Sequence, residues 1–219
     1  MRGRMAHRGR SGAGGGSAVC RHDSAKKRHR HVRRRTVRVG AIVNRSIPAI
    51  RPADCHGDTI MKRSDVKLVN LEPMNLLAVG HVGPYTKIGD AFDTLAQWLG
   101  ARRVQTSGAK LVGIFYDDPN QVEASKLRAS AAIHLPEAPD VTATSPVERI
   151  QLRGGAHAML LHEGPYDDLN AAWTWFYADW LPNSGRQADF AAPSFELYLN
   201  TPEEVAPDAL RTELYLPLV

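Results

Sequence analysis

The sequence has little cysteine and no long apolar run. Two cysteines, Cys20 and Cys55, are too few for a disulfide-rich secreted scaffold. No apolar run approaches the roughly 18–20 residues that span a bilayer, so we expect no membrane-spanning segment. The basic N-terminus is not followed by the continuous apolar region of a signal peptide, and we therefore expect a cytoplasmic protein.

Charge is divided unevenly along the chain. Residues 1–60 contain 15 of the 28 Lys and Arg residues but only 3 of the 23 Asp and Glu residues, a net charge of +12. Residues 61–219 carry −7, although the whole chain carries +5. The folded part is therefore expected to be acidic, and direct DNA binding by an acidic surface is not expected.

Residues 1–60 are rich in Gly, Ser and Arg, and this composition predicts a disordered basic segment. Three interpretations stay open: an arm that binds nucleic-acid phosphates, an organelle transit peptide, or a segment outside the native protein. The abrupt change in composition at Met61 favours the third, with Met61 as the true start. Cys20 and its neighbouring histidines lack the spacing of a zinc finger, so no metal site is expected.

Residues 61–219 contain an internal repeat. The sequence HVGPY at 81–85 returns as HEGPY at 162–166, and each copy follows an apolar strand and precedes an amphipathic helical pattern. Two further strands follow in each copy, and matching positions stay 81 to 83 residues apart. The matched segments are the helices 88–99 and 169–180, the strands 113–119 and 196–202, and the final strands 127–133 and 210–216.

The repeat predicts an α+β fold. Each copy, about 64–136 and 148–219, has the order β-α-β-β after a short opening strand at Val66–Leu71 or Arg149–Leu152, and residues 137–147 link the copies. Neither copy alone has a large core, so we expect one pseudo-two-fold unit of antiparallel sheets and helices. Such a unit needs no partner to close its core, which predicts a monomer with a ligand cleft between the halves.

The order HxGPY, aromatic helix, FELYLN-xP and LRTELYLPL is similar to the GyrI-like small-molecule-binding family over residues 64–219. That family includes the bacterial DNA gyrase inhibitor protein and effector-binding domains of AraC- and MerR-type regulators. The resemblance implies a duplicated β-α-β-β module that binds amphipathic or cationic compounds, or DNA gyrase, and protects against toxins. No helix-turn-helix is recognisable before Val66, which favours the stand-alone, gyrase-inhibitor type.

Glu196 is the strongest candidate for a binding residue. It lies in an apolar strand in which Phe195 and Leu197 share one face, so Glu196 and Tyr198 share the other. A carboxylate there is costly unless it is paired or attracts a cation. Gly113 occupies the matching position of the first copy, so the fold does not require the acid. The resemblance implies that an acid here faces a pocket for cationic amphipathic ligands.

Aromatic residues around Glu196 are the other ligand-binding candidates. Five rings are expected to form an aromatic wall that stacks on flat cations: Tyr198, Trp173, Trp175, Phe176 and Tyr177. Trp173 falls on the apolar stripe of its helix and Trp175 lies off it, which makes Trp175 the better pocket candidate. Tyr166 ends its Gly-Pro-Tyr turn, as Tyr85 does in the first copy, and a structural role is favoured for both. Tyr166 is still a ligand-binding candidate, because its hydroxyl could lie near Glu196.

Two alternatives to a binding protein stay open. The first is a small hydrolase of electrophilic xenobiotics, for which the resemblance implies a Tyr/Glu pair, here Tyr166 and Glu196. The second is a transcription regulator in which residues 1–60 contact DNA. His81 and His162 are not accompanied by a nucleophile motif, and no P-loop, GxGxxG or HExxH pattern occurs in residues 61–219. The sequence thus favours a binding protein without a cofactor over an enzyme.

Overall fold

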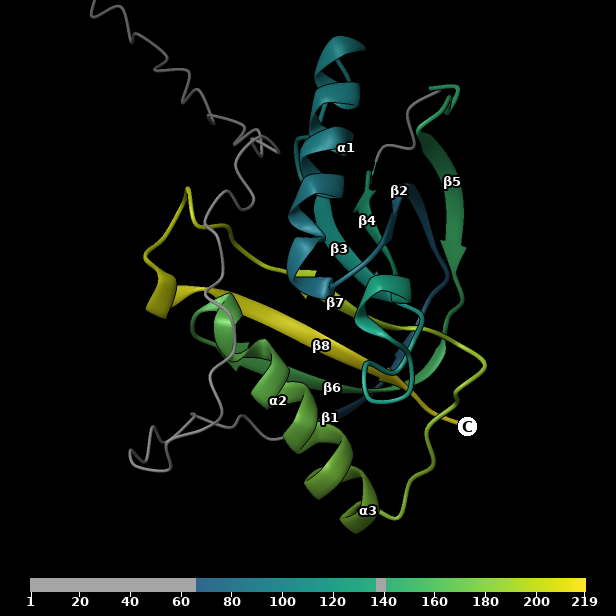
Figure 1. Cartoon of the computed structure of the whole chain (residues 1–219), viewed down its shortest axis with the longest axis vertical. Helices are drawn as coiled ribbons and strands as arrows, with labels where there is room; N and C mark the ends of the chain where they lie inside the picture. Colours follow the sequence, from purple (N-terminus) through teal and green to yellow (C-terminus); the bar gives the residue numbers. More distant parts are fainter. Residues whose placement is uncertain (1–65, 137–140) are drawn as a thin grey trace, which may run out of the picture. The chain divides into compact units, whose positions relative to one another are not determined.

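The computed structural model describes residues 66–136 and 141–219 (Figure 1). The predictions for residues 1–60 and for the centre of the linker lie outside the described residues. The α+β class is confirmed. The elements are β1 (Lys67–Leu71), β2 (Met74–Val82), α1 (Gly89–Ala101), β3 (Lys110–Phe115), β4 (Arg128–His134), β5 (Val147–Leu152), β6 (Gly155–Glu163), α2 (Leu169–Trp175), α3 (Leu181–Asn183), β7 (Ser194–Tyr198) and β8 (Arg211–Pro217).

All eight strands form one antiparallel sheet in the order β1-β6-β8-β7-β3-β4-β2-β5. The order is the same from either end when β1 is matched with β5, β2 with β6, β3 with β7 and β4 with β8, as expected for a duplicated module. The two copies pair at the centre of the sheet, β3 with β7, and also towards its two edges, where the opening strands β1 and β5 pair with β6 and β2 of the other copy. At the centre of the β3–β7 pair Gly113 lies opposite Glu196, the two positions that the repeat aligns.

Helices α1 and α2 cover the same face of the sheet. Phe92, Leu95 and Leu99 of α1 pack on alternate residues of β2, β3 and β4, and the apolar side of α2 packs on alternate residues of β6 and β8. These helical spacings are the ones that the sequence predicts. The intervening strand residues face the other way and form a third cluster with members from every strand, including Val112 and Phe195.

The two Gly-Pro-Tyr corners have the same structure. The hydroxyl of Tyr85 donates a 2.7 Å hydrogen bond to the backbone oxygen of Asp117, and the hydroxyl of Tyr166 donates a 3.3 Å bond to that of Asn200. Each bond ties the start of a helix to the end of the following strand. Tyr85 and Tyr166 therefore each stabilise one strand-to-helix corner of the fold through a hydrogen bond to the backbone.

The repeated histidines also belong to these corners. His81 Nε2 lies 3.0 Å from the backbone oxygen of Pro84, and His162 Nε2 lies 3.2 Å from that of Pro165. A ring nitrogen that donates to the carbonyl three residues later closes the turn. The structure thus gives the two histidines matching contacts within the turn.

The second helix contains a wide turn that the sequence periodicity did not predict. After α2, residues Phe176–Trp180 form a π-helical turn, and α3 follows directly. Pro182 lies within this continuous helix, where it has no N–H to donate and its ring clashes with the carbonyl four residues earlier. A wider turn before proline relieves that clash.

Gly154, before β6, is a position where only glycine fits. A Cβ atom at this position would clash with the backbone oxygen of Leu71, because the two atoms would lie closer than their van der Waals radii allow. We expect Gly154→Ala to lower the free energy of unfolding by about 1–3 kcal/mol, measured by urea denaturation. Gly80→Ala is the control, because nothing lies within 4 Å of a Cβ atom at Gly80. Equal losses in the two variants would contradict this explanation.

Candidate functional site

The carboxylate of Glu196 is buried on the helix-covered face of the sheet. Only 4% of the residue is exposed. Trp173 Nε1 donates a 2.7 Å hydrogen bond to Oε1, and the Tyr198 hydroxyl donates a 2.7 Å bond to Oε2. Both donors are uncharged, and no Lys, Arg or His of the described residues forms an ion pair with this carboxylate. The site therefore has hydrogen bonds for an acid but no compensating cation.

Burial controls the ionisation of this cluster. It raises the pKa of Glu196, and the hydrogen bonds from Tyr198 and Trp173 oppose that rise in part. The pKa of Tyr198 is raised well above its usual value by burial and then by the charge of Glu196. The pKa of Tyr166 is raised by burial and then by the charges of Glu196 and Glu204. Both tyrosines therefore keep their hydroxyl protons at neutral pH.

Aromatic rings surround the carboxylate. The Tyr198 ring meets the Tyr166 ring edge-on at 5.3 Å between centroids, and it meets Phe92 of α1 edge-on at 5.8 Å. Trp173 stacks on Phe176 at 5.8 Å. The structure thus brings together four of the predicted ligand-binding residues: Glu196, Tyr198, Trp173 and Tyr166.

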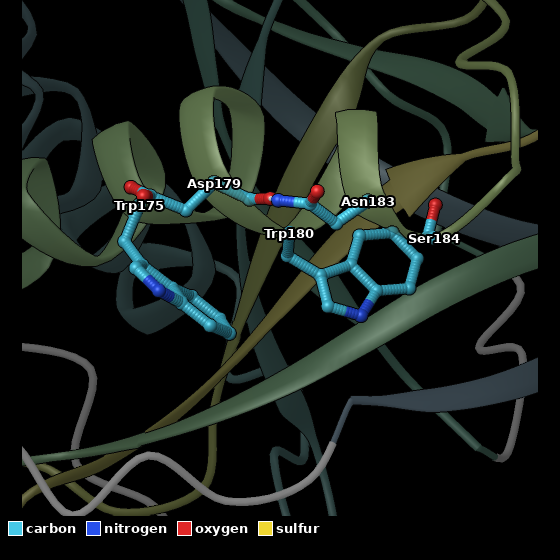
Figure 2. A pocket seen from close by; sticks show the side chains of 5 residues that line it. All are labelled: Trp175, Asp179, Trp180, Asn183 and Ser184. Carbon is cyan, nitrogen blue, oxygen red and sulfur yellow. Dashed lines mark hydrogen bonds between the residues drawn. The ribbon is translucent and has the colours of Figure 1, made fainter.

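Trp175 lies elsewhere. Being two residues from Trp173, it projects from a different side of α2, as helical geometry requires. It lines a separate groove of about 300 Å³ together with Asp179, Trp180, Asn183 and Ser184. Figure 2 shows the indoles of Trp175 and Trp180 projecting from the same side of the helix. The sequence ranked Trp175 above Trp173, whereas the structure places Trp173 on the carboxylate.

Of these four residues, Tyr166 matches Tyr85, but the first copy has an apolar residue or glycine in place of the other three. The pairs are Phe92 for Trp173, Gly113 for Glu196, and Phe115 for Tyr198. The fold therefore forms without this polar set, which is specific to the second copy. The change from Phe92 in the first copy to Trp173 in the second, which adds an N–H donor, is the sequence signal that could have identified Trp173.

Gly113 makes room for the cluster. A Cβ atom at Gly113 would lie 2.8 Å from the hydroxyl oxygen of Tyr198 and 3.2 Å from the ring of Phe115. Any larger residue there would push the Tyr198 hydroxyl away from Glu196. The two matching positions are therefore complementary: one carries the acid, and the other leaves space for its hydrogen-bond donor.

In residues 66–136 and 141–219, no group of three or more His, Cys, Asp or Glu side chains could hold a metal ion. None of the helices described there has both the length and the apolar character needed to cross a membrane. The buried carboxylate and the rings around it form the candidate binding site.

Comparison with known proteins identifies the family. The family model for the GyrI-like small molecule binding domain matches residues 64–219. The chain belongs to the GyrI-like family. This confirms the resemblance that the repeated HxGPY corners and the final strands indicate.

Relatives and solved structures agree with this GyrI-like assignment. The chain is 27% identical over 142 residues to the DNA gyrase inhibitor of Citrobacter koseri, covering 64% of this chain and 90% of the relative. It is 33% identical over 114 residues to that of Pectobacterium carotovorum, covering 51% and 73%. The EcmrR C-terminal domain aligns with a TM-score of 0.58 at 14% identity, covering 73% and 99%. At that identity the structural likeness shows the fold alone.

The raised pKa of Glu196 makes stability depend on pH. The folded GyrI-like domain holds this proton at pH values where the unfolded chain has released it. Stability therefore falls as pH rises from the ordinary value of 4.5 through the raised pKa, and it stays reduced above. We expect Glu196→Gln to melt about 2–4 °C above wild type at pH 8 and close to wild type at pH 4.

Melting curves at the two pH values test this, with the exposed Glu148→Gln as the control. Glu148 lies on β5 and is exposed, so its variant should change the melting temperature equally at pH 4 and pH 8. A lower melting temperature of Glu196→Gln at pH 8 would show that the ionised carboxylate stabilises the fold.

Proposed function

We propose that this GyrI-like protein binds amphipathic organic cations at Glu196. The observation that carries the proposal is a buried carboxylate whose hydrogen-bond donors, Trp173 and Tyr198, are both neutral. A buried charge without a counter-ion costs free energy. A cation that reaches Glu196 would remove that cost, and the surrounding rings would contact its flat apolar parts.

The rings lie between solvent and the carboxylate. Tyr166, Trp173 and Tyr198 are each partly exposed, whereas Glu196 beneath them is buried. A ligand therefore has to displace ring edges to reach the acid. This requirement favours apolar cations over small hydrated ones, because ring contacts offset the loss of the hydrogen bonds.

The contacts favour binding over hydrolysis. A Tyr/Glu hydrolase needs Tyr166 and Glu196 to act together. In the structure Tyr198, not Tyr166, donates to Glu196. The Tyr166 hydroxyl donates to the backbone oxygen of Asn200, just as Tyr85 fastens the other corner.

Direct binding of rhodamine 6G, a flat cationic dye, tests the proposal on the full chain. We expect saturable binding by wild type and a tenfold to hundredfold weaker affinity for Glu196→Gln, about the strength of a charge-assisted contact. Fluorescein, an anionic dye with the same ring system, should bind neither protein. Fluorescence polarisation measures all of these affinities.

Glu213→Gln is the matched control variant. Glu213 lies on the neighbouring strand β8 and also accepts a 2.7 Å hydrogen bond from a tyrosine, Tyr215. Its side chain belongs to the face of the sheet that the helices do not cover, since Tyr215 packs in that cluster. Rhodamine binding should be unchanged in this variant. Equal losses in both variants, or no loss in Glu196→Gln, would contradict the proposal.

The names of the relatives support a second proposal, that the protein binds DNA gyrase and thereby limits toxin damage. Two relatives at 27% and 33% identity are named DNA gyrase inhibitor. The −7 charge of residues 61–219 favours binding to a basic protein surface over binding to DNA.

A supercoiling assay tests this second proposal. Purified gyrase should supercoil DNA more slowly when the chain is added. Glu196→Gln should inhibit equally, because the acid is buried; unaffected supercoiling would contradict this second proposal.

A further inference from the structure

Thr212 of β8 carries a buried hydroxyl without a hydrogen-bond partner. The residue is 0% exposed, and in the described part of the chain its Oγ1 is the one buried side-chain nitrogen or oxygen that has no partner. Burying an unsatisfied hydroxyl costs about 1–3 kcal/mol. Valine has the same shape and would avoid that cost, so packing alone does not account for threonine here.

This hydroxyl lies beside the proposed binding site. Thr212 pairs directly with Tyr198 across β7 and β8, and Leu214, two residues on, pairs with Glu196. Leu214 packs under α2, so by strand alternation Thr212 also lies on the helix-covered face. Thr212 and Glu196 are thus diagonal neighbours on one face, and in such pairs the Cβ atoms lie within about 7–8 Å of each other.

The first copy again shows that the fold does not need this group. Ala129 occupies the matching position, is 2% exposed, and pairs with Phe115 and His81 just as Thr212 pairs with Tyr198 and His162. The second copy thus differs from the first at a fourth neighbouring position, again by gaining a polar group.

We propose that the Thr212 hydroxyl hydrogen-bonds to the ligand held by Glu196. The ligand is then an organic cation with a second polar group, such as a hydroxyl or carbonyl, about one aromatic ring away from its charge. The hydroxyl of Thr212 both donates and accepts, so it matches either kind of group. Tyr198, which pairs with Thr212 and donates to Glu196, supplies an aromatic ring at the same place. This inference rests on the proposed function.

A matched pair of probes tests it on the full chain: phenyltrimethylammonium and its 4-hydroxyl derivative. Both are aromatic cations, and only the second has a polar group, one ring away from the charge. We expect wild type to bind the hydroxylated cation about threefold to tenfold more tightly, as one neutral hydrogen bond allows. Thr212→Val and Thr212→Ala should bind the two cations equally, and Thr212→Ser should keep the preference. Isothermal titration calorimetry measures each affinity.

Stability separates a ligand contact from a structural role. Without ligand, Thr212→Val should melt no lower than wild type, because it replaces an unpartnered hydroxyl with a methyl group of similar size. A lower melting temperature, or an undiminished preference in Thr212→Val, would overturn the inference. Equal binding of both cations by wild type would overturn this inference alone. Binding of neither would contradict the proposed function as well.

Discussion

The buried carboxylate of Glu196 is the constraint that the packing of the second copy has to satisfy. A buried acid without a cation is costly, and the bonds from Trp173 and Tyr198 offset part of that cost. Tyr198 can reach the acid only because Gly113, directly opposite Glu196, leaves room for its hydroxyl. Strands β3 and β7 must therefore keep their register, and α2 its docking, for one side chain to stay hydrogen-bonded.

Duplication explains how the protein tolerates this cost. The first copy keeps apolar residues at the matching positions and builds an ordinary core, in which Phe92 is almost fully buried. The second copy repeats the same strands and the same turn contacts but carries polar groups in place of that apolar set. The strands of both copies belong to one sheet, and the apolar core of the first copy stabilises that sheet. The second copy can therefore contain an acid that lowers stability. Loss of stability at a binding site is a common cost of function.

Local patterns predicted most of the fold and part of the site. The spacing of apolar residues indicated the helices, and the repeat indicated the matched strands. The presence of an acid in an apolar strand pointed to Glu196, and strand alternation placed Tyr198 on the same face of the sheet. The choice between Trp173 and Trp175 depended on how α2 is rotated against the sheet, which periodicity alone does not determine. Thr212 was missed because an unpartnered hydroxyl follows from three-dimensional packing, not from residue type.

The second helix is held to β7 at two points, and this arrangement bears on how the proposed ligand would reach Glu196. Trp173 bonds to Glu196, and one turn later the Tyr177 hydroxyl lies 2.7 Å from Ser194 Oγ. Phe176, fully buried, fixes the helix between these contacts. Displacing the Trp173 indole breaks the first contact and leaves the others intact. Access to the carboxylate therefore needs a side-chain movement at one end of α2 rather than release of the whole helix.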